Sequence, residues 1–361
     1  MKTQSLLLTA LLLAGTSVLL HAQPAPNAPP YTALYVFGES WSVTTGGPYW
    51  NGHCANGPMW PEILSTNWGL AYAMANNYTR FFNGGTTSDV LDNQLAHFAG
   101  SSNAATGLFV VWAGGNDIGA YLFPSGTFSP RALTNTVGWS NLIVRMTRNL
   151  SNTVVRLHRK GARTVMLADL DEMQRLPFCP RLDDTQAALL SGQLQAGNRS
   201  LANTLAALDA SITNLRILRM NFHDRWNEFL DQAVSLGFTR ADVGVLDDAT
   251  LKDKSYTGPG SNYVFWDGSH TTSRTHEFWA KWFNEVTTQT RTETLRFVTR
   301  SNSLDLEMSK LKPGRSYTVQ TSHDLTSWTA QESFTPAEGS NTLTIAPSPS
   351  GPPMQVFRLT W

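Results

Sequence analysis

The stretch "LYVFGES", residues 34–40, places a serine directly after a short apolar run and a glycine. A short run of β-branched and aromatic residues is typical of a buried strand. Gly38 ends this run, so Ser40 lies where the strand passes into a loop. Most serines after strands are turn residues, and a nucleophile is the alternative. A nucleophilic Ser40 needs a base, a residue that orients the base, and donors for an oxyanion.

Further apolar runs alternate with helical patterns along the first two thirds of the chain. The helical patterns cover residues 135–160 and most of 184–236, and the strand-like runs cover 107–115, 163–170 and 216–222. Alternation of this kind predicts a parallel sheet covered by helices on both faces, which is a three-layer α/β/α fold. Active-site residues in such folds gather at the carboxyl ends of the strands, where Ser40 and the turn at 114–116 are expected to lie.

The pattern changes after about residue 292. Six short runs with turn signals between them follow, and Leu304, Leu306 and Met308 alternate with polar residues. This alternation predicts a small antiparallel β domain, a sandwich, over residues 293–361. The α/β domain is accordingly expected to occupy residues 31–292.

The N-terminus has the pattern of a targeting segment. A lysine at position 2 precedes a long apolar run, and Ala22 offers a small residue for cleavage. We therefore expect a signal peptide over residues 1–22 and a proline-rich linker over 23–30. No later stretch is apolar enough to span a bilayer, so the sequence predicts a soluble protein that is secreted or periplasmic.

The charge balance excludes some classes of partner. The 361 residues include 27 Lys and Arg and 27 Asp and Glu, a formal net charge of zero. No net field therefore attracts the chain to nucleic acid or to an anionic membrane surface. The sequence has no H-E-x-x-H motif, no Cys/His cluster and no dinucleotide or P-loop glycine pattern, so we expect neither a metal nor a nucleotide cofactor.

The chain has two cysteines, Cys54 and Cys179, and no C-x-x-C motif. In an oxidising compartment they are candidates for one disulfide, because both follow strands whose ends are expected on the same edge of the sheet. Two separate thiols remain the alternative, since a sequence does not show proximity.

The segment "WDGSH", residues 266–270, supplies a base and a residue to orient it. Asp267 and His270 lie three apart, a spacing that lets one loop direct both side chains at one place. A serine hydroxyl is a poor nucleophile until a base removes its proton, and a carboxylate fixes the tautomer of that base. His276 is a rival base, but no carboxylate precedes it at a comparable distance, which favours a packing or surface role.

Two glycine-containing segments supply candidate oxyanion donors. In "NGGTTSDVL", residues 83–91, the glycines expose backbone N–H groups, and in "AGGNDIG", residues 113–119, Asn116 carries a side-chain amide. Together with the backbone N–H of Ser40, these give three donors for an oxyanion. Each segment alone is a weak signal, because Gly-Gly and Asn-Asp turns are common.

In their order and spacing, "FGES", "NGGTTSDVL", "AGGNDIG" and "WDGSH" resemble the four blocks of the SGNH hydrolases, the GDSL-type esterases and lipases. The resemblance runs from about residue 34 to residue 282. It implies an SGNH-like fold, Ser40 as nucleophile, and Asp267 with His270 as the rest of the triad. It also implies an oxyanion hole formed by Ser40, Gly84 and Asn116. Alignment with the family's Gly-x-Thr-Thr version selects Gly84, with Gly85 as the alternative.

The family's usual aspartate in the first block is Glu39 here. Because that residue is not the triad carboxylate, the chemistry is expected to persist. The resemblance predicts a secreted serine ester hydrolase acting on a small-molecule or polysaccharide ester, with a carbohydrate acetylesterase as the first choice. The alternatives are a lipid or lysophospholipid esterase, and a non-catalytic carbohydrate-binding protein that kept the fold.

Overall fold

The computed structural model describes residues 5–11, 31–212 and 214–288 and, nearer the C-terminus, 294–299, 304–309, 311, 316–322, 327–336, 340–345 and 354–360. The predicted linker over 23–30 lies outside the described residues. The chain forms two compact units. The larger unit comprises Pro29–Leu208 and Asn214–Thr288, and the smaller comprises Met1–Ala28, Asp209–Thr213 and Gln289–Trp361.

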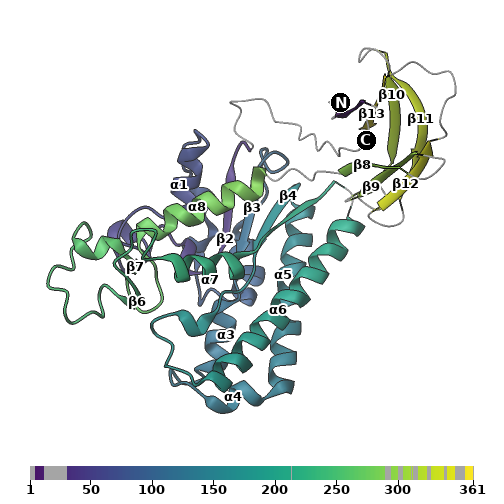
Figure 1. Cartoon of the computed structure of the whole chain (residues 1–361). Helices are drawn as coiled ribbons and strands as arrows, with labels where there is room; N and C mark the ends of the chain where they lie inside the picture. The colour runs from purple at the N-terminus through teal and green to yellow at the C-terminus, as the bar shows by residue number, and fades with distance from the viewer. Residues whose placement is uncertain are drawn as a thin grey trace. The chain divides into compact units, whose positions relative to one another are not determined.

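A four-stranded parallel sheet forms the centre of the larger unit (Figure 1). Its strands follow chain order: β2 (Leu34–Gly38), β3 (Leu108–Trp112), β4 (Thr164–Ala168) and β5 (Arg216–Met220). All residues of β2 and β3 are buried, as their continuous apolar runs require. The sheet confirms the predicted α/β class.

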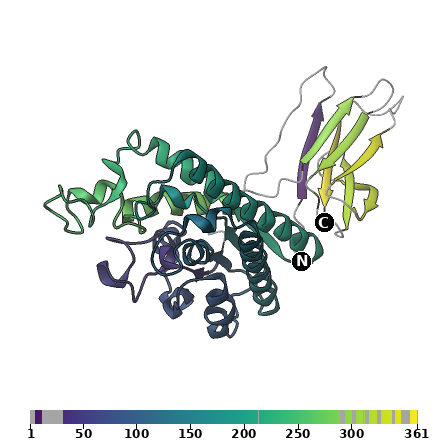
Figure 2. The same ribbon diagram turned by 90° about the horizontal axis from the view of Figure 1, so that it is seen from below.

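Helices connect and cover these strands. Because neighbouring strands follow one another in the chain, right-handed connections place the long crossover helices, α5 between β3 and β4 and α6 between β4 and β5, on one face of the sheet. Helices α1 and α8 contact each other. They lie on the face of the sheet opposite α5 and α6, as the two views in Figures 1 and 2 show. The helices are α1 (Trp60–Asn67), α2 (Thr87–Asp92), α3 (Gly115–Leu122), α4 (Pro130–Thr134), α5 (Thr136–Arg159), α6 (Asp184–Ser211), α7 (Phe222–Gln232) and α8 (Ser273–Thr288).

An aromatic core lies between the sheet and α8. The ring of Trp112, at the end of β3, lies 4.5 Å from that of Phe222 and 5.1 Å from that of Trp279. Trp60 of α1 stacks on Phe283 of α8 with ring centroids 4.2 Å apart. Large buried rings of this kind contribute much of the apolar burial in a core. They hold the carboxyl ends of the strands rigidly.

A two-stranded parallel sheet, β6 (Arg240–Gly244) with β7 (Tyr263–Phe265), leads into the "WDGSH" segment. The sequence analysis did not predict these strands, since β7 has only three residues and its apolar run is too short to give a period. The backbone N–H of Trp266 donates to the carbonyl of His270 over 2.7 Å. This hydrogen bond closes the loop that carries Asp267.

The smaller unit has two antiparallel sheets, with strand orders β1-β13-β10-β11 and β12-β9-β8. Apolar side chains from both sheets form one buried cluster, which includes Leu306, Met308, Tyr317, Val319 and Phe357. Each of the six runs predicted after residue 292 contains one strand. They are β8 (Thr294–Thr299), β9 (Leu304–Ser309), β10 (Tyr317–Ser322), β11 (Thr329–Phe334), β12 (Ser340–Ile345) and β13 (Met354–Thr360).

The segment predicted to be a signal peptide contains β1 (Ser5–Leu11), which pairs antiparallel with β13. Removal of residues 1–22 would leave β13 as an edge strand of its sheet. Because edge strands expose unpaired backbone groups, that cleavage would create a new site for strand pairing.

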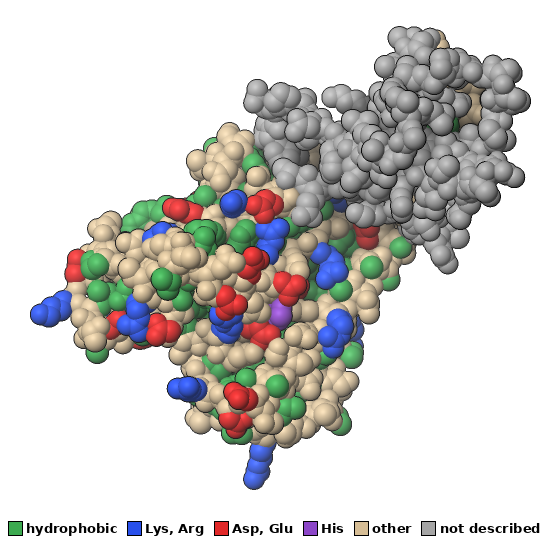
Figure 3. Space-filling view, viewed as in Figure 1, with side chains coloured by type: hydrophobic (Ala, Val, Ile, Leu, Met, Phe, Trp, Pro, Cys, Tyr) green, Lys and Arg blue, Asp and Glu red, His purple; other side chains and the backbone are tan. Residues whose placement is uncertain are grey.

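The surface of the larger unit has no dominant sign of charge on the face shown in Figure 3. Acidic and basic side chains are interspersed there among polar and apolar ones. This agrees with the balanced composition of 27 basic and 27 acidic residues. Within the part of the chain that the structure describes, no helix has the length and apolarity needed to cross a membrane.

Position 38 requires glycine, because there is no space for a Cβ atom. A Cβ atom at this position would lie 2.2 Å from the carbonyl oxygen of Trp112. We predict that Gly38→Ala destabilises the protein by about 3 kcal/mol or more, since the clash is with backbone and cannot be relieved by a rotamer change. Gly69→Ala is the matched control, because Gly69 also has a positive φ of 68° but a Cβ there would have no atom within 4 Å. Urea unfolding of both variants measures the difference, and equal midpoints would contradict the prediction.

Candidate active site

Ser40 lies at the carboxyl end of β2, where it begins a short 3-10 turn, η1 (Ser40–Ser42). The N–H of Glu39 donates to the carbonyl of Trp112 over 3.2 Å, which continues the pairing of β2 with β3 up to the serine. Ser40 is half-buried and borders an open cleft of about 720 Å³. Gly84, Asn116 and Ser269 border the same cleft. Segments far apart in the sequence therefore meet beside Ser40.

Asp267 and His270 form a hydrogen-bonded pair. Nδ1 of His270 lies 2.7 Å from Oδ2 of Asp267, and the backbone N–H of His270 donates to Oδ1 over 2.7 Å. Tyr49 also donates its hydroxyl to Oδ2 of Asp267. Burial raises the pKa of Asp267, but the hydrogen bonds from His270 and Tyr49 outweigh it and hold this pKa below its usual value. Asp267 is therefore ionised at neutral pH and fixes one ring orientation of His270.

One tryptophan joins the serine turn to the loop of this pair. The indole N–H of Trp41, the residue after Ser40, donates to the carbonyl of Ser269 over 2.8 Å. Ser269 lies directly before His270.

Among the described residues, Ser40 Oγ has no hydrogen-bond partner, so the hydroxyl is free to turn toward an incoming group. Hydrogen bonds between nucleophile and base often tighten only when substrate binds.

The two glycines of the "NGG" segment differ in what their N–H groups do. Gly85 donates its N–H to Oδ2 of Asp89 over 3.2 Å, so this donor is already used. Gly84 borders the cleft, and its N–H makes no hydrogen bond to a described residue. Both glycines have a positive φ, 83° at Gly84 and 59° at Gly85, which is the conformation that glycine adopts most readily.

Asn116 lies in the first turn of α3, at the carboxyl end of β3. Its backbone N–H and its side-chain amide both donate to Oε2 of Glu39, over 3.3 and 3.1 Å. The amide NH₂ group has two hydrogens, so one remains for a ligand in the cleft. Glu39 therefore fixes which end of the Asn116 amide faces the cleft. The sequence alone gave Glu39 no role.

The neighbouring Asp117 has a different set of partners. It is buried, and it accepts hydrogen bonds from the backbone N–H of Thr87 over 2.7 Å and from its hydroxyl over 3.0 Å. The amide of Asn149 in α5 donates to the same hydroxyl over 3.2 Å. Asp117 thus joins α3 to α2, which is a structural role.

The remaining wall of the cleft is mostly apolar. Phe178 donates its backbone N–H to the carbonyl of Gly268 over 2.9 Å, which ties this wall to the loop of Asp267. The rings of Phe123 and Phe178 lie 5.4 Å apart. The apolar residues of this wall are Ala120, Phe123, Met173, Leu176 and Phe178. Apolar side chains that line a pocket typically contact the hydrocarbon part of a ligand.

Neither His276 nor His53 borders the cleft. His276 is fully buried against Trp279, and burial lowers its pKa to about 3, so it is a neutral packing residue as expected. His53 is also buried, beside Glu62, with Nε2 2.9 Å from the carboxylate. Burial lowers the pKa of His53, but the hydrogen bond to Glu62 outweighs it and raises the net pKa.

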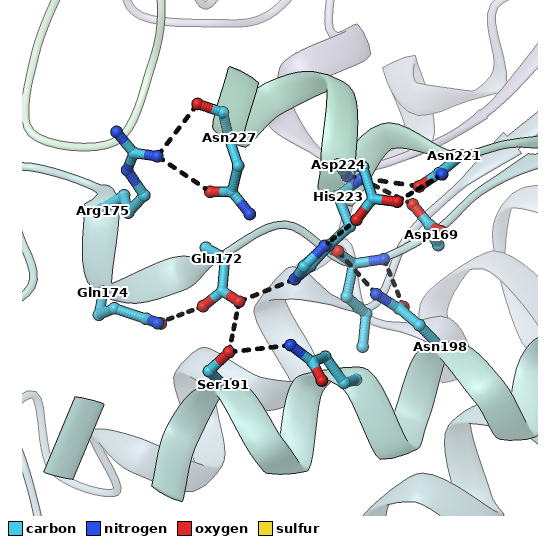
Figure 4. A network of polar contacts seen from close by, with 12 residues as sticks. Asp169, Glu172, Gln174, Arg175, Ser191, Asn198, Asn221, His223, Asp224 and Asn227 are labelled. Carbon is cyan, nitrogen blue, oxygen red and sulfur yellow. Dashed lines mark hydrogen bonds and ion pairs between the residues drawn. The ribbon is translucent and has the colours of Figure 1, made fainter. Parts of the chain in front are cut away.

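A polar network surrounds His223 at the carboxyl end of β5 (Figure 4). Its Nε2 lies 2.8 Å from Oε1 of Glu172, and its Nδ1 lies 2.8 Å from Oδ1 of Asp224. Ser191 of α6 donates to the same Glu172 oxygen over 2.6 Å. Hydrogen bonding to Glu172 is the main reason that the pKa of His223 is raised to about 9, so the ring is positively charged at neutral pH. With both ring nitrogens engaged, His223 braces the loop after β4.

The predicted disulfide between Cys54 and Cys179 is not present, and both thiols are free. Cys54 is packed in a small apolar cluster with Val43, Ala55 and Met59. Cys179 lies in a turn whose N–H donates to the carbonyl of Leu176. The expectation rested on two loops ending at one edge of the sheet, but a disulfide also requires matched Cβ positions.

Three residues of the site were missed by sequence reasoning. Gln94 is fully buried, and its side chain accepts from the N–H of Gly38 over 2.9 Å and donates to its carbonyl over 2.7 Å. Tyr49 holds the Asp267 carboxylate, and Asp171 borders the cleft. Only Asp171 had a signal in the sequence, since it lies just after a predicted strand.

Among the described residues, no group of three or more His, Cys, Asp or Glu is arranged to hold a metal ion.

The similarity of the chain to known families follows its sequence motifs. The model of the GDSL-like lipase/acylhydrolase family matches residues 34–283. The chain therefore belongs to the GDSL-like lipase/acylhydrolase family, which confirms the resemblance seen in those motifs. A search of curated proteins finds no match.

Solved structures with similar folds include two Streptomyces enzymes. Phospholipase A1 from Streptomyces albidoflavus NA297 is 15% identical, with a TM-score of 0.43 over 71% of this chain and 99% of that chain. The extracellular lipase from Streptomyces rimosus is 15% identical, with a TM-score of 0.40 over 71% of this chain and 100% of that chain. A gut microbial diltiazem-metabolizing enzyme is 8% identical, with a TM-score of 0.40 over 83% of this chain and 69% of that chain.

Alkylation tests the state of the two cysteines. Burial raises the pKa of Cys54 to about 12 and that of Cys179 to about 11, so both thiols react slowly in the folded protein. We predict that alkylation after denaturation without reductant labels both cysteines, while the native protein labels slowly. Mass spectrometry of the unreduced protein counts the labels, and an unlabelled pair that becomes reactive only after reduction would contradict the free thiols.

Proposed function

We propose that the protein is a serine ester hydrolase with Ser40 as nucleophile, His270 as base and Asp267 as the residue that orients the base. The observation that carries this proposal is the shared cleft, in which Ser40 and Asn116 meet the loop of the Asp267–His270 pair. A non-catalytic binding protein has no need for a histidine fixed by an ionised carboxylate in a loop that borders the same cleft as a free serine hydroxyl.

The reaction follows from this arrangement. Ser40 Oγ attacks the ester carbonyl carbon, and its proton passes to Nε2 of His270. Asp267 accepts the Nδ1 proton in a hydrogen bond and stabilises the positive ring. His270 then gives its proton to the alcohol oxygen as the C–O bond breaks, which leaves an acyl group on Ser40. A water molecule, deprotonated by His270, releases the acid and restores the serine.

Three donors are assigned to the oxyanion in this proposal. They are the backbone N–H groups of Ser40 and Gly84 and the remaining amide hydrogen of Asn116. Gly84 is preferred to Gly85 because the Gly85 N–H already donates to Asp89. Fixed donors of this type stabilise the charge that develops on the carbonyl oxygen and need no reorganisation during the reaction.

The apolar wall of the cleft favours a particular kind of acyl group. Phe123, Met173 and Phe178 provide a surface that an acetyl group is too small to cover. We therefore place an ester with a longer acyl chain, the lipid-type alternative, ahead of an acetyl ester of a sugar. Export of the protein by its N-terminal segment is part of the same proposal.

A chain-length series tests the proposed function. We expect hydrolysis of p-nitrophenyl esters, with kcat/KM rising from acetate to butyrate and octanoate by roughly tenfold for every two buried methylene groups. Ser40→Ala should remove this activity. A wild-type protein without any esterase activity would contradict the proposal, and a maximum at acetate would support the acetylesterase alternative instead.

Substitutions at Asn116 and Asp117 separate catalysis from stability. Asn116→Ala should lower kcat by about 10²–10³-fold with little change in KM, because the lost hydrogen bond forms mainly in the transition state. Asp117→Ala should mainly lower stability, by about 1–3 kcal/mol, because it leaves the buried Thr87 donors without an acceptor. Steady-state kinetics and urea unfolding of both variants give the comparison. Full activity of Asn116→Ala would show that its amide is only a turn group.

A further inference from the structure

Asp171 is a buried carboxyl group for which the triad has no use. It follows β4 and borders the same cleft as Glu39, and only 6% of its surface is exposed. Its Oδ2 atom is buried, and among the described residues no group donates a hydrogen bond to it. A buried carboxylate oxygen without a donor is costly, because the charge loses its hydration. Protonation of this carboxyl group would remove the buried charge.

Glu39 has the matching requirement. It is also 6% exposed, and the only hydrogen bonds of its carboxyl group with described residues are those that Oε2 accepts from the two donors of Asn116. Glu39 and Asp171 border the same cleft, and the charge of Asp171 is one of the causes that raise the pKa of Glu39. Among the described residues, no Lys, Arg or His side chain forms an ion pair with either carboxyl group. Two like charges buried together are strongly unfavourable, so one of the pair must be neutral.

The other charged groups around the pair do not remove this conflict. Asp117 faces Glu39 and adds negative charge. Asp169 and Glu172 face Asp171 and add more, while the imidazolium of His223 opposes them. That imidazolium is shared with Glu172 and Asp224. Burial is the largest cause that raises the pKa of Asp171 to about 7, and burial together with Asp171 raises that of Glu39 well above its usual value.

We propose that Asp171 is a positioning residue that shares a proton with Glu39 and, through Glu39, fixes the amide of Asn116 in the oxyanion hole. The role in the oxyanion hole rests on the proposed function, whereas the shared proton does not. The proton bridges the two carboxyl groups, so the pair carries one negative charge instead of two. Oε2 of Glu39 is then left to accept from Asn116.

The shared proton has a consequence for catalysis. Negative charge develops on the substrate oxygen beside Asn116, and a second charge on the carboxyl pair would oppose it. Loss of the last shared proton at alkaline pH therefore lowers kcat. The pair titrates as a unit, so the resulting limb of the pH profile belongs to both residues.

Kinetics of three variants test the role in catalysis. Asp171→Ala should lower kcat by about tenfold with KM little changed, because it removes the group that holds Glu39. Asp171→Asn should recover most of that loss, since its N–H replaces the shared proton, and it should lack the alkaline fall in kcat. Asp92→Asn, the same change at an exposed residue, is the control and should follow the wild type. A wild-type kcat in Asp171→Ala, or an unchanged alkaline limb in Asp171→Asn, would overturn the proposal.

The pH dependence of stability tests the shared proton without any substrate. The folded pKa of Asp171 is raised above its unfolded value, so its contribution to stability is present below the unfolded pKa and is lost as pH rises toward about 7. The Tm of the wild type should thus fall more between about pH 5 and about pH 8 than the Tm of Asp171→Asn. Equal falls would overturn the shared proton. If the wild type hydrolyses no ester but this difference in Tm is observed, only the proposed function fails.

Discussion

The hydrogen bonds between the Gln94 side chain and the backbone of Gly38 are the constraint on which the site depends. Gln94 holds both the N–H and the carbonyl of Gly38, two residues before Ser40. Its amide also donates to Asp89, the residue that accepts from Gly85. One buried amide therefore fixes the end of the nucleophile strand relative to the "NGG" loop. A buried network in which every group has a partner is rigid, and rigidity is what a set of oxyanion donors requires.

The parts of the molecule that could be predicted from the sequence are those encoded locally. The strands β2 to β4 appear as apolar runs because nearly all of their residues are buried, and the helix α5 appears as a helical period because one of its faces is buried. Asp267 and His270 are close in sequence, so their pairing follows from one loop. The same holds for the short strands of the smaller unit, whose alternation is visible within each run.

The rest of the site depends on contacts between distant segments. Tyr49 and Gln94 occur in stretches without regular pattern, and their roles arise only because those stretches fold against Asp267 and Gly38. The disulfide expectation was wrong for the same reason. The expectation placed Cys54 and Cys179 near one edge of the sheet, but the direction of each Cβ is set by local packing that no pattern encodes.

Glu39 shows how a departure from a family motif can be accommodated. The longer side chain reaches both donors of Asn116, which lies at the end of the neighbouring strand. Gly115 makes room for it, because a Cβ there would lie 3.2 Å from each carboxyl oxygen of Glu39. A larger residue at 115 would push the carboxyl group away from Asn116. The glutamate, the glycine and the asparagine thus form one unit across β2 and β3, and their sequence positions are best understood together.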